Sequence, residues 1–409
     1  MRPDLTLFSM IMLVGAAHGL FLALTLINTR DAGVAGRPFL AILTLAFAVD
    51  LGHEFLFQSR YLLDALALAY IDPIVNLLYG PSFYLYACAL TGGVTFRFTR
   101  WHWLHALPVI VATIACLALP DLTSEQFARL FYENGIGLTA DEVLVQRTIG
   151  SIALASVFSI GIYLFLSMRL LVRHARVIRQ QFSSLEKVTL NWLRALLLAL
   201  SVLYFVLIFN GFFGELVGLD ENLNRMLYLM VVVVIYSMGY MGIRQPAIFA
   251  SPESVAALES VQHAPEPATD NAVSGTPRDG AKYRTSALDS AMSAALRDEL
   301  QSYMNKERPY LESQLTLPQL AQQLGISPNY LSQVINEQLQ KNFFDFINEY
   351  RVAEAKSKLT AGSTTKRSIA DVAYDSGFNS KSAFYTAFKK HVGMTPSEFR
   401  ASESRANQV

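Results

Sequence analysis

Residues 317–327 read LPQLAQQLGIS, and a related pattern, IADVAYDSGFNS, returns at residues 369–380. In both stretches apolar or small side chains recur at spacings of three and four, which predicts an amphipathic helix. A glycine follows each helix, Gly325 in the first copy and Gly377 in the second, where a left-handed backbone is easiest without a side chain. The repeat therefore predicts two helix-turn-helix units.

A second helix is expected after each turn. Ser327 and Ser380 are the residue type that caps helix N-termini, and Pro328 occupies a preferred first-turn position. The residues expected to face the core are Leu331, Val334 and Ile335 in the first unit and Phe384, Ala387 and Phe388 in the second. A plain helical bundle is an alternative for one copy, but two matching copies argue strongly against it.

A long helix is expected between the two units, over Phe343–Leu359. Its apolar positions are Phe343, Phe346, Ile347, Tyr350 and Ala353. Apolar residues at these spacings form one face of a helix. We expect this helix to hold the two units at a fixed separation.

The C-terminal motifs resemble the signature of the AraC/XylS family of transcription regulators. They are DVAYDSGFNSKSAF at 371–384, FKK at 388–390 and GMTPS at 393–397, and the resemblance covers residues 281–402. The segments 331–336 and 343–351 are similar to a subgroup in which a membrane sensor of about seven helices precedes the DNA-binding domain. Less specific similarities to the membrane half of that subgroup lie at 80–86, 182–186 and 191–194.

The resemblance implies sequence-specific binding to double-stranded promoter DNA, and it is compatible with a homodimer. The N-terminal residues of the second helix of each unit would then enter the major groove. The base-reading candidates are Asn329, Ser332 and Gln333 in the first unit and Lys381, Ser382, Tyr385 and Thr386 in the second. The phosphate candidates are Ser327, Ser380, Lys389 and Lys390, although the two lysines could equally form a solvated surface.

The N-terminal part of the chain contains seven long apolar segments. They are Leu5–Ile27, Pro38–Phe57, Ala67–Leu90, Trp103–Leu119, Thr148–Val172, Trp192–Val217 and Met226–Ile243. A helix of about 20 apolar residues crosses a bilayer, and a soluble core could hardly bury seven of them. We therefore predict an all-α chain, with a polytopic seven-helix membrane domain at 1–247, a flexible linker rich in Pro, Ala, Ser and Gly at 248–281, and an all-helical double helix-turn-helix domain at 282–409.

Basic residues in the short loops predict the orientation of these segments. With the N-terminus outside, the inner side holds Arg30, Arg37, Arg97, Arg100, Arg169, Arg173, Arg176, Arg179, Lys187, Arg194 and Arg244. The outer side then holds Arg2, Arg60, Arg129, Arg147 and Arg225. The excess of positive charge belongs on the cytoplasmic side. We thus expect a multi-pass protein of the bacterial cytoplasmic (inner) membrane, with its DNA-binding domain in the cytoplasm.

Several polar residues interrupt the apolar segments and are candidates for a sensor pocket. They are Asp50, His53, Glu54, Asp72, Asn76, Asn210 and Glu215. Charged groups in a bilayer are costly and usually functional. Three interpretations remain open: a ligand or proton site, a buried network that holds helices together, or residues at the membrane interface.

Other classes of function have little support in the sequence. The chain carries 33 basic and 33 acidic residues. Its two cysteines lie in apolar segments, which argues against a disulfide framework. No cofactor, metal site or catalytic constellation is expected, and the chain is predicted not to be an enzyme. The expected function is an activator or repressor that responds to an unknown small-molecule or membrane signal. The alternatives are a transporter- or enzyme-like membrane domain with an attached regulator, or spans that act only as an anchor.

Overall fold

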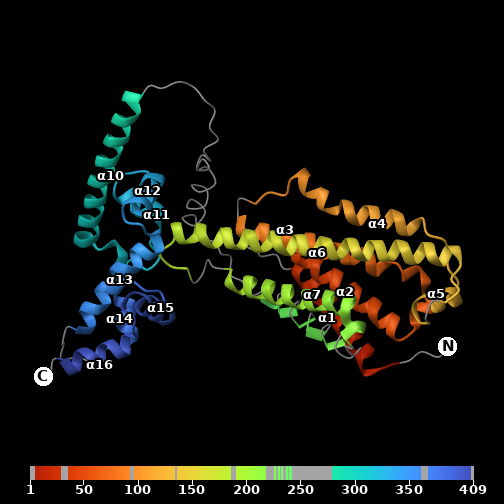
Figure 1. Cartoon of the computed structure of the whole chain (residues 1–409). Coiled ribbons are helices and arrows are strands. Elements are labelled where there is room, and N and C mark those ends of the chain that lie inside the picture. Colours follow the sequence, from red (N-terminus) through yellow and green to blue (C-terminus); the bar gives the residue numbers. More distant parts are fainter. Residues whose placement is uncertain are drawn as a thin grey trace. The chain divides into compact units, whose positions relative to one another are not determined.

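The structure of this chain is a computed structural model. It describes residues 5–28, 36–92, 96–133, 136–185, 190–217, 225–226, 229–230, 232–233, 236–237, 239–241, 279–360 and 367–406. Within these ranges the regular elements are all helices, and one isolated β-bridge joins Phe182 to Thr316 (Figure 1). The described part of the chain is therefore all-α, as predicted.

The chain divides into two compact units. The first comprises Met1–Val172 and Leu190–Ala250, and the second comprises Arg173–Thr189 and Ser251–Val409. The short segment Arg173–Thr189 thus belongs with the C-terminal part of the chain, although it precedes the last apolar segments in sequence.

The first unit is a bundle of apolar helices. They are α1 (Leu7–Asn28), α2 (Arg37–Gln58), α3 (Ile71–Gly92), α4 (Leu107–Leu117), α5 (Ser124–Phe131), α6 (Ala140–Gln181) up to Val172, and α7 (Asn191–Val217), with short 3₁₀ turns at Tyr61–Asp64, Leu66–Leu68 and Arg100–Ala106. Among the described residues, six helical segments are long and apolar enough to cross a membrane. They correspond to the first six predicted segments, whereas most of Met226–Ile243 lies outside the described residues.

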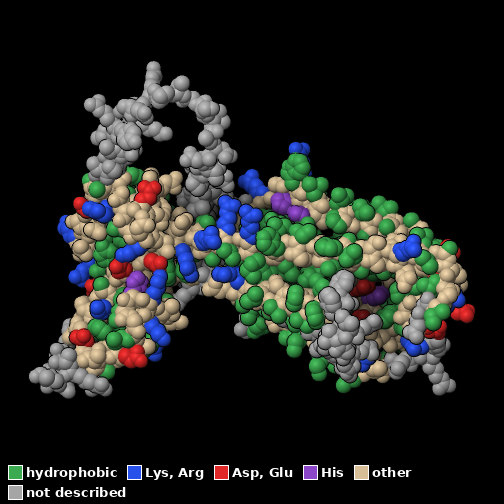
Figure 2. All heavy atoms as spheres, in the orientation of Figure 1, with side chains coloured by type: hydrophobic (Ala, Val, Ile, Leu, Met, Phe, Trp, Pro, Cys, Tyr) green, Lys and Arg blue, Asp and Glu red, His purple; other side chains and the backbone are tan. Residues whose placement is uncertain are grey.

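The core of this unit lies between α1, α2, α3, α6 and α7. Leu26, Leu40, Tyr86, Leu171 and Leu193 are buried together in it. The outward faces of the helices remain apolar, and Figure 2 shows hydrophobic side chains over much of this unit's visible surface. A water-soluble bundle normally covers its outward faces with polar residues.

The helix α6 is much longer than the predicted segment Thr148–Val172. It begins at Ala140, inside what the sequence suggested was an outer loop, and continues to Gln181. The basic residues after Val172 therefore extend a helix instead of forming a loop. Apolar runs locate only the part of a helix that faces an apolar environment, so polar extensions escape them.

The second unit contains the predicted repeat. Its helices are α10 (Asp279–Glu307), α11 (Leu317–Gln323), α12 (Pro328–Gln338), α13 (Phe343–Thr360), α14 (Ile369–Asp375), α15 (Lys381–Val392) and α16 (Pro396–Ala406), with a 3₁₀ turn at Pro309–Leu311. The pairs α11–α12 and α14–α15 are the two helix-turn-helix units, and α13 runs between them (Figure 1).

Each helix-turn-helix unit has its own core, and α13 contributes to both. Phe343, Phe346 and Ile347 pack in the core of the first unit, whereas Val352 and Ala355 pack in that of the second. The six residues predicted to face the core from α12 and α15 are all buried. The prediction was wrong for Ala353, which is exposed, because the buried face of α13 turns from one core to the other at this point.

Side-chain caps fix where the four short helices begin. The hydroxyls of Ser327 and Ser380 accept from the backbone N–H of Tyr330 and Ala383, which confirms both serines as N-caps. Thr316 and Ser368 form capping boxes at the starts of α11 and α14. These caps satisfy N–H groups that have no partner inside the helix.

Candidate functional sites

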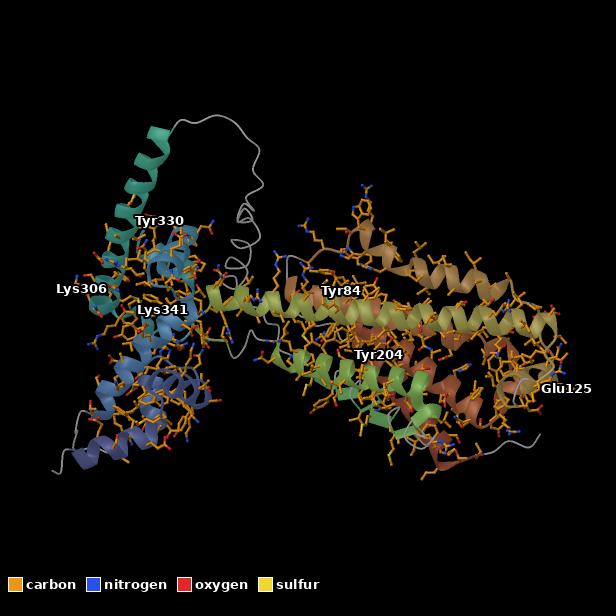
Figure 3. The ribbon with its side chains drawn as sticks, in the orientation of Figure 1. Tyr84, Glu125, Tyr204, Lys306, Tyr330 and Lys341 are labelled. Carbon is orange, nitrogen blue, oxygen red and sulfur yellow. The ribbon has the colours of Figure 1, made fainter. Side chains whose placement is uncertain are left out.

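The N-terminal turns of α12 present polar side chains. Asn329 and Gln333 are exposed and Ser332 is half-buried, so the three predicted base-reading residues lie on an accessible stretch of helix (Figure 3, beside Tyr330). The Gln333 amide donates to Glu337 at 3.1 Å, and the Asn336 amide donates to the Ser332 hydroxyl at 3.3 Å. These are weak surface contacts that a base edge could replace.

The matching turns of α15 are also accessible. Lys381, Ser382 and Thr386 are exposed and Tyr385 is half-buried. The Lys381 ammonium lies 5.7 Å from the centre of the Tyr385 ring, and the Tyr385 hydroxyl is 3.2 Å from the Ser397 hydroxyl. The structure thus brings the four base-reading candidates of the second helix-turn-helix unit together at the start of α15.

The four phosphate candidates differ in the contacts that their side chains already make. Lys389 and Lys390 are both exposed, but the Lys390 ammonium is 2.6 Å from a carboxylate oxygen of Asp345 on α13. The hydroxyls of Ser327 and Ser380 serve as caps, so any phosphate contact at these positions would come mainly from backbone N–H groups of the first turn.

Arg351, which the sequence did not single out, lies on α13 between the two helix-turn-helix units. It is 1% exposed, and its Nε donates to the carbonyl of Tyr310 at 2.8 Å. Burial lowers the pKa of this guanidinium to about 10, which leaves it charged at neutral pH. The nearby Gly377 has a φ of 86°, and a Cβ there would lie 2.4 Å from the Tyr310 carbonyl oxygen. Gly377 had been singled out in the sequence for its position after a helix, and it was the signal that could have led to this contact with Tyr310 and Arg351.

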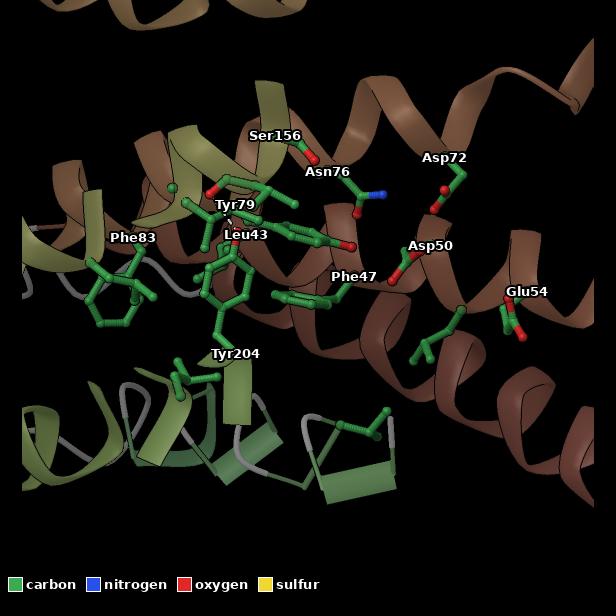
Figure 4. Close-up of a pocket in the computed structure, with 17 residues that line it drawn as sticks. Leu43, Phe47, Asp50, Glu54, Asp72, Asn76, Tyr79, Phe83, Ser156 and Tyr204 are labelled. Atoms are coloured by element: carbon green, nitrogen blue, oxygen red, sulfur yellow. Dashed lines mark hydrogen bonds between the residues drawn. The ribbon is translucent and has the colours of Figure 1, made fainter. Parts of the chain in front are cut away.

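The first unit contains a cavity of about 320 Å³. Asp50, Glu54, Asp72 and Asn76 from α2 and α3 line it, with the three carboxyl groups at one end (Figure 4). Four of the seven predicted sensor residues therefore meet there. His53 and Asn210 do not line the cavity, and the side chain of Glu215 lies outside the described residues.

The rest of this cavity is apolar and aromatic. The rings of Phe47 and Tyr79 stack with their centres 4.0 Å apart, and the Tyr204 hydroxyl donates to the carbonyl of Val157 at 2.5 Å. The described lining includes carboxyl groups but no Lys, Arg or His. Such a chamber suits a proton or an apolar molecule that carries a cationic group, because carboxylates favour positive charge.

Comparison with known proteins defines the class of the C-terminal part. Residues 320–402 match a protein family described as "Helix-turn-helix domain". This region is a helix-turn-helix domain, in agreement with the two helix pairs seen in the structure.

The relatives that this chain resembles are bacterial regulators of the AraC type. It is 35% identical over 99 residues to the arabinose operon regulatory protein of Escherichia coli (strain K12), covering 24% of this chain and 33% of the relative. It is 30% identical over 95 residues to the melibiose operon regulatory protein of the same organism, covering 23% and 30%. These matches support the AraC/XylS resemblance of the C-terminal part.

The likeness is confined to part of each curated relative. The arabinose operon regulatory protein of Salmonella typhimurium is 33% identical over 115 residues, which span 28% of this chain and 39% of that protein. A solved structure of a protein of unknown function from Listeria innocua is 32% identical, covering 25% of this chain and 93% of that one, with a TM-score of 0.23.

Proposed function

We propose that this protein is a sequence-specific, DNA-binding transcription regulator anchored in the cytoplasmic membrane. The observation that carries the proposal is the pair of helix-turn-helix units, each of which exposes polar residues at the start of its second helix. Helices of this kind read base edges with their N-terminal residues. Two of them joined by α13 can read two segments of one DNA site.

The proposed contacts follow from the chemistry of the exposed side chains. Gln333 and Asn329 on α12 suit adenine, whose edge offers both a donor and an acceptor. Lys381 on α15 suits guanine, and the Thr386 methyl group suits thymine. Lys389 is exposed and, unlike Lys390, could contact a phosphate without first breaking an ion pair with Asp345.

The membrane part of the proposal is supported by the outward faces of the first unit. On α6, Phe158, Ile162 and Phe165 are 64%, 58% and 67% exposed. Their spacing of four and three places them on one side of the helix. Exposed aromatic and branched apolar side chains in such a row favour contact with lipid. The proposed orientation, with the N-terminus outside, keeps the second unit in the cytoplasm with the DNA.

We assign signal detection to the cavity lined by Asp50, Glu54 and Asp72. A specific observation favours sensing over a mere anchor. An anchor needs no cavity, yet this cavity is lined by acidic residues, which are costly to place in lipid. The proposed signal is a cation-bearing small molecule or a change in protonation. Its binding would alter the packing of α2 and α3, and through the chain the state of the DNA-binding domain.

The proposed DNA reading is tested by selecting duplexes from a random pool with the full-length chain in lipid nanodiscs. We expect a discrete consensus, and we expect Gln333→Ala and Lys381→Ala each to weaken binding by about 1–3 kcal/mol and to relax the consensus at separate positions. Lys306→Ala, an exposed change at the end of α10, is the control. A chain that enriches no sequence would contradict the proposal.

A further inference from the structure

An extended piece of chain directly after α6 is built into the second unit. Phe182 pairs with Thr316 in an antiparallel bridge, and the Ser183 N–H donates to the Leu315 carbonyl at 3.2 Å. Phe182 and Ser183 are 7% and 1% exposed. This segment therefore contacts the chain just before α11, at the entrance to the first helix-turn-helix unit.

Ser183 also completes the environment of a buried cation. Arg351 donates from Nη1 to the Ser183 carbonyl at 3.0 Å and from Nη2 to the Ser183 hydroxyl at 3.1 Å. Its other acceptors are the carbonyls of Tyr310, described above, and Glu312 at 2.7 Å. Ser183 thus supplies two of the four acceptors, and its departure would leave a buried charge with half of its hydrogen-bond partners, which is costly.

A third contact reaches the second helix-turn-helix unit. The Asn379 amide donates to the Ser184 hydroxyl at 2.7 Å. Asn379 lies directly before Ser380, which caps α15. One run of three residues therefore bonds to the entrance of α11, to the middle of α13 and to the entrance of α15.

We propose that Phe182–Ser184 is a clamp that holds the two helix-turn-helix units in one mutual arrangement and so raises affinity for DNA sites read by both. Its docking surface comprises Leu315, Arg351 and Asn379, and the occupant is this segment of the same chain. Strand-like addition through backbone bonds is a common way for proteins to bind an extended segment. Prior arrangement of both units removes an entropic cost that DNA binding would otherwise carry.

The clamp gives the proposed signal a direct covalent route. Phe182 follows α6, a single helix whose residues up to Val172 belong to the first unit and whose last residues belong to the second. A movement of this helix that withdraws Phe182–Ser184 would release the two helix-turn-helix units from each other. This inference rests on the proposed function, since it assumes that both units bind DNA.

The test uses the full-length chain in nanodiscs and two duplexes drawn from the selected consensus, one complete and one scrambled in the half read by α15. For Ser183→Ala combined with Ser184→Ala, we expect affinity for the complete duplex to fall by about 5- to 30-fold, as for the loss of the two side-chain hydrogen bonds, one of them to a charged group. Affinity for the half-scrambled duplex should change by less than about twofold, because only one unit reads it. Ser357→Ala, which removes an exposed hydroxyl from α13, is the matched control.

A disulfide cross-link tests the opposite change, in which the clamp is held in place. Cys88 and Cys116, both in the first unit, are replaced by alanine, and Ser184→Cys is combined with Asn379→Cys to join the two contacting positions. We expect the oxidised chain to bind the complete duplex at least as tightly as its reduced form. The clamp would be refuted if oxidation abolished binding, or if the double alanine variant bound the complete duplex as well as or better than the unmodified chain. Failure of the unmodified chain to bind any selected duplex would instead contradict the proposed function.

Discussion

Two glycines at equivalent positions of the repeat have different surroundings. Gly325 and Gly377 both have positive φ angles, of 69° and 86°. A Cβ on Gly325 would meet nothing within 4 Å, whereas one on Gly377 would lie 2.4 Å from the Tyr310 carbonyl oxygen and 3.1 Å from Arg351 Nε. The first glycine is therefore needed for its backbone angle alone, and the second also for space.

This contrast predicts unequal effects of the same substitution. Gly325→Ala should destabilise the domain by about 1–2 kcal/mol, the cost of a left-handed backbone at a residue with a side chain. Gly377→Ala should cost about 1–3 kcal/mol more, because the added methyl group overpacks the junction around Arg351. Urea titration with pulse proteolysis of the full-length chain measures both. Equal losses would show that the close approach at Gly377 is relieved by a small shift.

The two adjacent lysines of α15 also differ. Lys389→Ala should weaken binding to all duplexes about equally and reduce the slope of log affinity against log salt by about one, as for a lost phosphate contact. Lys390→Ala should change the slope less, because the Lys390 ammonium is paired with Asp345. Fluorescence anisotropy at several salt concentrations measures this. The assignment would be contradicted if Lys390→Ala gave the larger change in slope.

Sequence reasoning succeeded where a residue's role is local. The caps Ser327 and Ser380, and the buried faces of α12 and α15, follow from spacings of a few residues. The capping boxes at Thr316 and Ser368 were overlooked, although a Gln or Asp three residues later marked both. Arg351 could not be found this way, because its partner Ser183 lies 168 residues away in the sequence.

At the scale of elements, hydrophobic runs located the helices but not their full extents. The first six predicted apolar segments match six helical segments, yet α6 exceeds its prediction at both ends and reaches from Ala140 to Gln181. Hydrophobicity reflects the surroundings of a residue. The polar ends of α6 are helical but do not face an apolar environment, so the apolar run did not include them. The cavity was partly predictable, because spacings of four placed Asp50 beside Glu54 and Asp72 beside Asn76 on single helix faces.

The cavity between these elements predicts a separable effect on regulation. Asp50→Asn combined with Asp72→Asn should change transcription from a promoter bound by this protein by at least about fivefold, the lower end of usual coupling between sites. Binding to a selected duplex in the absence of signal should stay unchanged, since both residues lie in the first unit and the DNA-reading candidates lie in the second. A reporter fusion and a duplex titration provide the two measurements, with Glu125→Gln on α5 as the control outside this cavity. Unaltered transcription would favour an anchor over a sensor.

At the scale of the whole molecule, one chain contains a helix-turn-helix domain and a bundle of helices with apolar outward faces. The sequence suggested this pairing because composition changes sharply along the chain, whereas the inclusion of Arg173–Thr189 in the second unit emerged only in the folded structure. A membrane-resident regulator must meet its promoter at the membrane, so its accessible sites depend on where the chromosome comes close.

Chromatin immunoprecipitation of the full-length protein in its own cell, carried out on the membrane fraction after cross-linking, shows whether the protein binds promoters while it resides in the membrane. We expect a few discrete promoter peaks that contain the consensus selected in vitro, recovered with the membrane and lost in a chain that carries Gln333→Ala and Lys381→Ala together. Absence of peaks from the membrane fraction, with the protein present there and its inducing condition varied, would contradict a membrane-resident regulator.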